Sequence, residues 1–96
     1  TAGGLWKVMA DVLSESTTSK NAVGRLGHGL GMQLTEWPSN MKGDKTVMQP
    51  GMVMTLEPCI EFADGRIMVH EENIVIRDGE PELLSIRAPS EIPLIY

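Results

Sequence analysis

Four glycines fall within eight residues, at Gly24, Gly27, Gly29 and Gly31. This density is too high for a helix and costly in an ordinary strand, because glycine loses more backbone freedom on folding than any other residue. The chain must therefore bend here, or another part of the molecule must approach its backbone closely. His28 lies in the middle of this segment, so whatever approaches the backbone also approaches an imidazole.

The length and charge of the chain exclude several classes of protein. Its 96 residues have room for one small domain, and its net charge of −5, with scattered basic residues, argues against a nucleic-acid partner. No run of about 20 apolar residues predicts a membrane span. A single cysteine, Cys59, is typical of a reducing compartment, so we expect a cytoplasmic protein. The chain opens on Thr1 rather than Met, so we expect it to be a piece of a longer protein.

The first predicted element is a helix at about residues 4–16. Apolar side chains recur there with the three- and four-residue spacing of an amphipathic helix. They are Leu5, Val8, Met9, Val12 and Leu13. The polar run from Ser14 to Ser19 predicts its end, because these side chains compete for backbone hydrogen bonds.

Strand patterns occupy the second half of the chain, after a stretch rich in turn residues. In order, we predict a long surface loop at 31–45, a turn at 50–51, a strand at 52–57, its continuation at 60–62, a hairpin turn at 63–66, a returning strand at 67–76 and a last short strand at 83–86. Pro58 predicts a bulge or break in the first long strand, because proline donates no hydrogen bond to a sheet.

Three ionisable residues lie where an ordinary core would not place them: His28, Glu57 and Glu71. Glu57 shares a strand face with Thr55, and Glu71 shares one with Val69. A carboxylate on a face that packs inward costs several kcal/mol unless a cation or strong donors satisfy it. Imidazole and carboxylate donors suit Mn, Fe, Co or Zn ions. A metal site is one interpretation; a hydrogen-bonded loop histidine and two solvated glutamates are the other.

Three motifs carry a resemblance to a known family. They are Gly27-His28-Gly29-Leu30-Gly31, the run Pro50-Gly51-Met52-Val53 leading into Thr55-Leu56-Glu57-Pro58, and His70-Glu71-Glu72-Asn73-Ile74-Val75-Ile76. In order and spacing they resemble the C-terminal half of the creatinase, prolidase and methionine aminopeptidase superfamily, peptidase family M24. The resemblance implies an α+β fold: residues 1–96 as one fragment, the C-terminal half of a pita-bread domain, with one N-terminal amphipathic helix packed on a curved antiparallel sheet.

The resemblance also implies a chemistry. Members hold two divalent metal ions (Mn, Co, Fe or Zn) with two Asp, one His and two Glu, and a metal-bridging hydroxide cleaves a peptide or related C–N bond, as in Xaa-Pro aminopeptidases and dipeptidases. By position, His28 and Glu57 resemble the ligands of one ion and Glu71 resembles the carboxylate that bridges both. The implied catalytic residues are His28, Glu71 and Thr35, and the implied substrate is a small molecule or short peptide.

This sequence departs from the family pattern in two ways. The aspartate pair belongs to a strand that would precede Thr1, so we expect the isolated chain to bind metal weakly and to lack hydrolytic activity. Thr35 stands where peptidase members carry a second histidine. A threonine hydroxyl still donates a hydrogen bond but has a shorter reach and cannot become a cation. The alternatives are therefore a creatinase-type or ectoine-hydrolase-type enzyme with a non-peptide substrate, or a noncatalytic interaction domain.

The expected partners follow from the missing half of the fold. Half of a pita-bread domain exposes apolar surface that the N-terminal half would cover. A second copy of the same chain is the simplest substitute, and closed twofold pairs are common. We therefore expect a homodimer when the N-terminal half is absent.

Overall fold

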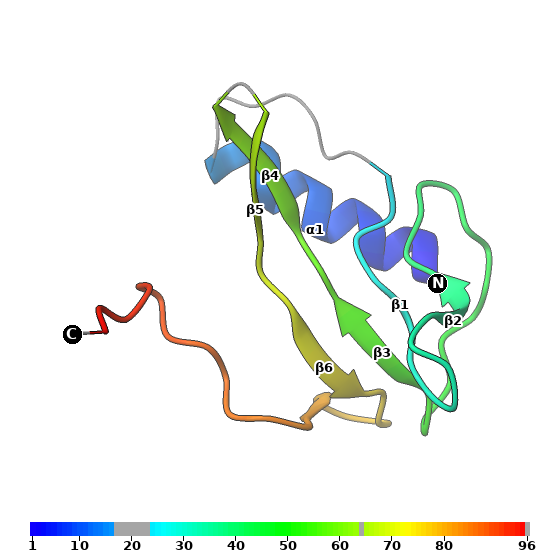
Figure 1. Cartoon of the computed structure of the whole chain (residues 1–96). Helices are drawn as coiled ribbons and strands as arrows, with labels where there is room; N and C mark the ends of the chain where they lie inside the picture. The colour runs from blue at the N-terminus through cyan, green and yellow to red at the C-terminus, as the bar shows by residue number, and fades with distance from the viewer. Residues whose placement is uncertain (17–23, 64, 96) are drawn as a thin grey trace.

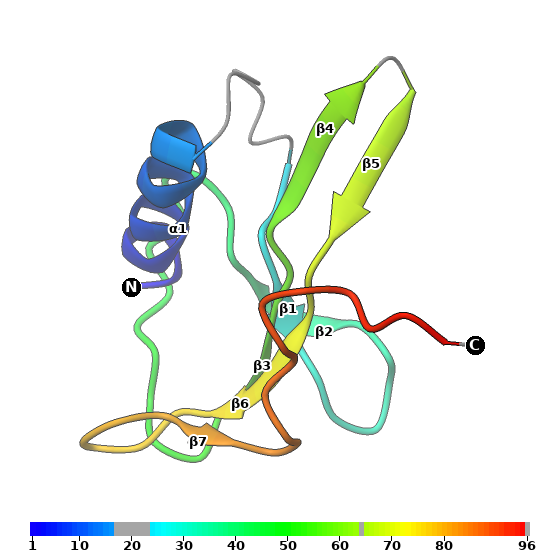
Figure 2. The ribbon, with the colours of Figure 1, turned by 90° about the vertical axis from the view of Figure 1, so that its left-hand side faces the viewer.

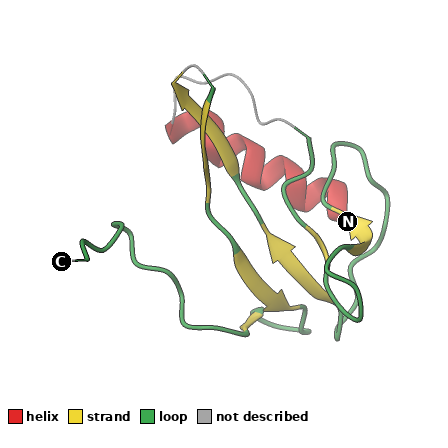
Figure 3. Ribbon diagram, viewed as in Figure 1, coloured by secondary structure: helices red, strands yellow, loops and turns green. Residues whose placement is uncertain are grey.

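The computed structural model describes residues 1–16, 24–63 and 65–95. Within them the chain forms one helix and seven strands, whose arrangement is drawn in Figures 1 and 3. In chain order these are α1 (Ala2–Ser16), β1 (His28–Gly29), β2 (Glu36–Ser39), β3 (Val53–Leu56), β4 (Cys59–Ala63), β5 (Arg66–Val69), β6 (Glu72–Val75) and β7 (Glu82–Leu83).

The strands form two antiparallel sheets. The larger has the order β2-β1-β3-β6-β7, and the smaller is the pair β4-β5. Since β4 follows β3 and β5 leads into β6, both sheets share one long hairpin, which rises across the molecule in Figure 1. One helix with antiparallel strands confirms the predicted α+β class.

In Figure 2, helix α1 lies to the left of the strands, and the β4-β5 hairpin extends upward as the continuation of β3 and β6. The helix begins at Ala2, earlier than predicted, because the segment around residue 45 receives its first amide groups. The Ala2 amide donates to the Thr46 carbonyl and the Gly3 amide to the Asp44 carbonyl, both at 2.9 Å. A Cβ at Gly3 would lie 2.6 Å from the Asp44 carbonyl oxygen, so this contact requires glycine.

The buried face of α1 differs in part from the predicted one. Three of the predicted residues are half-buried: Leu5, Met9 and Leu13. Val8 and Val12 are 62% and 59% exposed, so their assignment to the core is wrong. Val8 and Val12 lie on the side of the helix that is turned away from the rest of the protein. The opposite side faces the protein, and there the Trp6 indole N–H donates to the Gly24 carbonyl at 3.0 Å. The helix ends at Ser16, and the rest of the predicted polar terminator, 17–19, lies outside the described residues.

The predicted close approach to the glycine segment is confirmed. A Cβ at Gly27 would lie 2.0 Å from the Thr55 carbonyl oxygen, and its φ of +150° already disfavours other residues. A Cβ at Gly29 would lie 2.3 Å from the Trp37 carbonyl oxygen. Neighbouring strands therefore flank β1 on both sides with no room for side chains at these positions.

The prediction of a long loop at 31–45 is wrong in its middle. Strand β2 forms there and pairs with β1, with Gly29 opposite Glu36 and His28 opposite Ser39. The segment shows no strand periodicity and contains proline, so its pairing comes from the neighbouring backbone of β1 and not from local preference.

Other strand boundaries also differ from the predicted ones. The strand predicted at 52–57 spans Val53–Leu56, and the last strand is Glu82–Leu83. The returning strand predicted as continuous over 67–76 is interrupted at residues 70–71. Pro58 lies opposite this interruption and has no amide hydrogen to donate, which breaks the ladder on both strands. The turn at 50–51 is confirmed, with Gly51 at φ +92°. The turn at 63–66 includes residue 64, which lies outside the described residues.

The core is small and sits where β1, β3 and β6 meet. Its buried apolar residues are Ala2, Leu26, Met54, Ile74 and Val75. Three polar residues are buried with them: His28, Asn40 and Thr55. The C-terminal segment after β7 extends away from the body in Figure 1, with Ile86 97% exposed. Across the described ranges, no helix is long and apolar enough to cross a membrane.

Candidate functional site

His28 is held on β1 with its ring buried and oriented. Its side chain is 7% exposed, and its backbone amide donates to the Thr55 hydroxyl at 3.0 Å. Ring atom Nδ1 lies 2.8 Å from the Gly29 carbonyl oxygen. Because a carbonyl oxygen only accepts, Nδ1 carries the hydrogen of this bond. Atom Nε2 is therefore the ring nitrogen whose lone pair is left for another partner.

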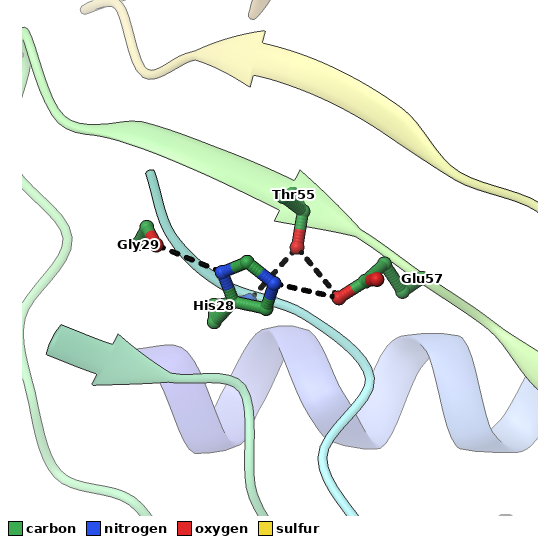
Figure 4. A network of polar contacts seen from close by, with 4 residues as sticks. All are labelled: His28, Gly29, Thr55 and Glu57. Atoms are coloured by element: carbon green, nitrogen blue, oxygen red, sulfur yellow. Dashed lines mark hydrogen bonds and ion pairs between the residues drawn. The ribbon is translucent and has the colours of Figure 1, made fainter. Parts of the chain in front are cut away.

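That partner is Glu57, which follows the end of β3. Its backbone amide donates to the Leu26 carbonyl at 2.9 Å, and this bond fixes its position beside β1. Its Oε2 lies 3.0 Å from His28 Nε2 and 3.0 Å from the Thr55 hydroxyl, as Figure 4 shows. Since the Thr55 oxygen accepts from the His28 amide, its own hydrogen is directed to the Glu57 carboxylate. The side chains of Glu57 and Thr55 therefore point to the same side of the chain, as predicted.

The contact between His28 Nε2 and Glu57 Oε2 requires a proton or a cation between the two atoms. With the Nδ1 hydrogen bonded to Gly29, a bare Nε2 and a carboxylate oxygen would face each other as two acceptors. A proton, carried by the ring or by the carboxyl group, relieves this, and so does a cation bound by both atoms. A carboxylate oxygen is a typical ligand of divalent transition metals, and so is an imidazole whose other ring nitrogen is fixed by a backbone carbonyl. These two residues therefore fit a metal ion.

The structure does not gather Glu71 with this pair. Glu71 is exposed and lies between β5 and β6, so its predicted place on an inward-packing face is wrong. Residues 65–70, which precede Glu71, are exposed as well, so Glu71 follows a stretch of the chain that nothing covers. Among the residues that the structure describes, no three His, Cys, Asp or Glu side chains lie close enough to hold a metal ion. Thr35 is also exposed and directly precedes β2.

Sequence reasoning missed the role of Thr55 in this site, and it did not single out Asn73, which lies opposite Thr55. Thr55 is fully buried and connects the His28 amide to the Glu57 carboxylate. Asn73 lies opposite Thr55 in the β3-β6 register, and its buried Oδ1 has no hydrogen-bond partner in the structure. The signal was present: Thr55 precedes Glu57 by two residues and Asn73 follows Glu71 by two, which is the spacing of one strand face.

Two carboxylates away from this pair have perturbed acidity. The Ala88 amide donates to Glu72 at 2.9 Å and, with a smaller contribution from His70, holds the pKa of Glu72 below its ordinary value. Hydrogen bonds from Thr46 hold the pKa of Asp44 below its ordinary value. The contact with Glu72 holds the segment after β7 in place. The contact with Asp44 holds the turn whose carbonyl groups accept hydrogen bonds from the start of α1.

Comparison with known proteins gives a consistent result. The model of metallopeptidase family M24 matches residues 1–78. The chain is 30% identical over 84 residues to an Xaa-Pro dipeptidase of Pyrococcus furiosus, covering 86% of this chain and 24% of that protein. It is 34% identical over 85 residues to a probable dipeptidase, PepE, of Mycobacterium bovis, covering 88% and 22%.

A solved structure gives the same result for the fold. The prolidase of Pyrococcus horikoshii superposes with a TM-score of 0.82 at 29% identity, covering 96% of this chain and 26% of that one. This likeness confirms the predicted pita-bread fold. The chain spans about a quarter of the length of the relatives it matches. With a family model that covers most of its residues, the chain belongs to metallopeptidase family M24.

Proposed function

We propose that this chain is the C-terminal part of a dinuclear metal-dependent hydrolase that cleaves Xaa-Pro dipeptides. The observation that carries the proposal is the 3.0 Å contact between His28 Nε2 and Glu57 Oε2, with Nδ1 committed to the Gly29 carbonyl. Relatives named Xaa-Pro dipeptidase and prolidase supply the substrate class.

In this proposal His28, Glu57 and Glu71 are the residues of this chain that would help to hold two divalent ions. The register of the larger sheet supports the role of Glu71. Val53 lies opposite Val75 and Thr55 opposite Asn73, so the same register carried one step further places Glu57 opposite Glu71.

When bound, such ions activate a water molecule as the nucleophile and polarise the scissile carbonyl. The chain's own residues perform the positioning. The Gly29 carbonyl holds the His28 ring so that Nε2 faces the site, and the Thr55 hydroxyl holds one Glu57 oxygen in place. We assign Thr35 to the substrate, to which its exposed hydroxyl donates a hydrogen bond.

The site is incomplete in these 96 residues, and the rest of the ligands come from the remaining three-quarters of the protein in this proposal. We therefore expect the isolated chain to bind metal weakly and to leave Xaa-Pro dipeptides intact. Titration calorimetry with Mn²⁺, Co²⁺ and Zn²⁺ measures the first property. His28→Ala and Glu57→Gln should abolish the weak binding, whereas the exposed control variants His70→Ala and Glu61→Gln should retain it.

The longer polypeptide encoded by the same gene tests the activity. We expect it to hydrolyse an Xaa-Pro dipeptide, to lose this activity on chelation and to recover it with added Mn²⁺ or Co²⁺. His28→Ala in that polypeptide should remove both activity and bound metal. Full activity in the presence of a chelator, or unchanged metal content in His28→Ala, would contradict the proposal.

Thr35 favours a second candidate. Its neutral hydroxyl replaces the histidine of peptidase members, which suits a substrate whose reaction does not need a cationic donor at that position. The second candidate is a hydrolase of a non-peptide C–N bond, of the creatinase or ectoine-hydrolase type. Hydrolysis of such a substrate together with inertness toward Xaa-Pro dipeptides, and no gain of peptidase activity in Thr35→His, would select it.

A further inference from the structure

Asn40 directly follows β2 and is fully buried in the core. Its backbone is fixed by two hydrogen bonds: the Asn40 amide donates to the Gly27 carbonyl at 3.0 Å, and the Asn40 carbonyl accepts from the Leu26 amide at 2.8 Å. The side-chain atoms Nδ2 and Oδ1 are buried as well, and neither has a hydrogen-bond partner among the described residues. A buried amide group without partners costs free energy, so native proteins supply partners to nearly all such groups.

The 96 residues of this chain are sufficient to enclose this amide group. Asn40 has 0% of its surface exposed when the chain is taken alone. Any further part of a longer protein adds cover from outside and does not reach atoms that are already enclosed. The partner of the Asn40 side chain therefore lies within the core of this chain, and it is small enough to be enclosed there.

The carbonyl oxygen of Thr55 lies close to the Asn40 side chain. A Cβ built on Gly27 would be 2.0 Å from this oxygen and 2.8 Å from Asn40 Nδ2, so both atoms approach the same point beside Gly27. One of them is a hydrogen-bond acceptor and the other is a donor. No hydrogen bond joins these two atoms directly, although both belong to described residues.

The register of the sheet leaves this carbonyl without the amide that a regular ladder would give it. Gly29 lies opposite Met54, so one residue further along the ladder the His28 amide would meet the Thr55 carbonyl. The His28 amide donates to the Thr55 hydroxyl instead, at 3.0 Å. The Thr55 carbonyl therefore remains available to another donor.

We propose that one water molecule is bound in the core between the side-chain amide of Asn40 and the carbonyl of Thr55. The water accepts a hydrogen bond from Asn40 Nδ2 and donates one to the Thr55 carbonyl oxygen. Its second hydrogen is available to Asn40 Oδ1, which belongs to the same amide group. About three hydrogen bonds are typical of a buried water. Water suits this position better than a cation, because the hydrogens on Nδ2 would repel a positive charge.

The bound water connects the end of β2 to the strand that supports the candidate site. The Thr55 hydroxyl contacts the His28 amide and the Glu57 carboxylate, and the water contacts the carbonyl of the same residue. Asn40 thereby helps to hold Thr55 from the side of β2. This inference is independent of the proposed hydrolase chemistry, because it involves neither a metal ion nor a substrate.

A crystal structure of the longer polypeptide, at a resolution that shows ordered water, tests the proposal directly. We expect a separate density peak about 2.7–3.2 Å from both Asn40 Nδ2 and the Thr55 carbonyl oxygen. A direct hydrogen bond from Asn40 Nδ2 to a protein atom, with no peak between the two groups, would overturn the proposal. Crystals soaked in Rb⁺ test the chemical identity of the peak: an anomalous signal there would identify a monovalent cation and would also overturn it.

Magnetic relaxation dispersion, which counts the water molecules that stay bound to a protein for a long time, gives a second readout in solution. Asn40→Leu replaces the amide with an apolar group of similar size, so the longer polypeptide should lose one long-lived water. The matched control Gln33→Leu replaces an exposed amide and should keep the wild-type number. An unchanged number in Asn40→Leu would contradict the proposal. If Asn40→Leu does not fold, the crystal structure of the wild-type polypeptide still decides between the two results.

Discussion

Replacing Thr55 by valine tests the contact on which the candidate site is built. The Thr55 side chain is fully buried, accepts the His28 amide at 3.0 Å and donates to Glu57 Oε2 at 3.0 Å. Valine has nearly the same shape but no hydroxyl. Thr55→Val therefore leaves the packing in place and removes both hydrogen bonds.

The magnitude follows from the burial of the two partners. A buried amide left without a partner costs about 1–3 kcal/mol, and a hydrogen bond to a charged group contributes about 1.5–3 kcal/mol. The Glu57 side chain is 26% exposed, so water replaces part of the second contribution. We expect the free energy of unfolding to fall by about 2–4 kcal/mol. In a domain of this size that lowers the melting temperature by roughly 4–8 °C per kcal/mol.

Urea unfolding followed by circular dichroism measures this change, with Thr55→Ser as the control. Serine keeps the hydroxyl and loses a methyl group, which costs about 1 kcal/mol. The variant Thr55→Val should also bind Co²⁺ more weakly than Thr55→Ser, because the Glu57 oxygen is no longer held beside His28. Equal destabilisation by valine and serine would refute the role assigned to the hydroxyl.

Two further predictions concern the backbone and the helix start. Gly29→Ala should destabilise the chain by about 3 kcal/mol or more, since its Cβ would lie 2.3 Å from the Trp37 carbonyl oxygen and neither backbone yields easily. The control Gly79→Ala, where no atom lies within 4 Å, should change the unfolding free energy by less than about 0.5 kcal/mol; similar effects of the two variants would contradict the close strand contact. The hydrogen bonds from Thr46 lower the pKa of Asp44 from 3.8, so their stabilisation is fully present above pH 3.8 and is lost as the pH falls through the lower folded value. Asp44→Asn should flatten the acid limb of a stability profile measured by circular dichroism, and an unchanged limb would exclude this carboxylate as a contributor.

The parts of the fold that were predicted correctly rest on local patterns. The three- and four-residue spacing of apolar side chains located α1, and alternation with a glycine turn located the long hairpin. The crowding of glycines near His28 correctly indicated a backbone approached by other strands. Strand β2 was missed because its own residues show no strand periodicity. It forms because the backbone of β1 pairs with it, with Gly29 opposite Glu36.

The candidate site was predicted in part for a similar reason. His28 and Glu57 meet as expected, since His28 lies in β1 and Glu57 directly follows β3, the neighbouring strand of the larger sheet. Glu71 does not join them, because the ladder is interrupted opposite Pro58 and its side chain turns to solvent. The contribution of Thr55 became clear only when the directions of its two hydrogen bonds were known.

By itself, the sequence determined which residue types could serve a metal site and which strand face each would share, since both depend on composition and on a period of two. The tertiary structure decided the rest: which side of α1 is covered, where the returning strand between β5 and β6 breaks, and that one ring nitrogen of His28 is committed to Gly29 while the other faces Glu57. These features depend on contacts between segments far apart in the chain. Their energies come from burial and from the direction of individual hydrogen bonds, and no local pattern of residues encodes either.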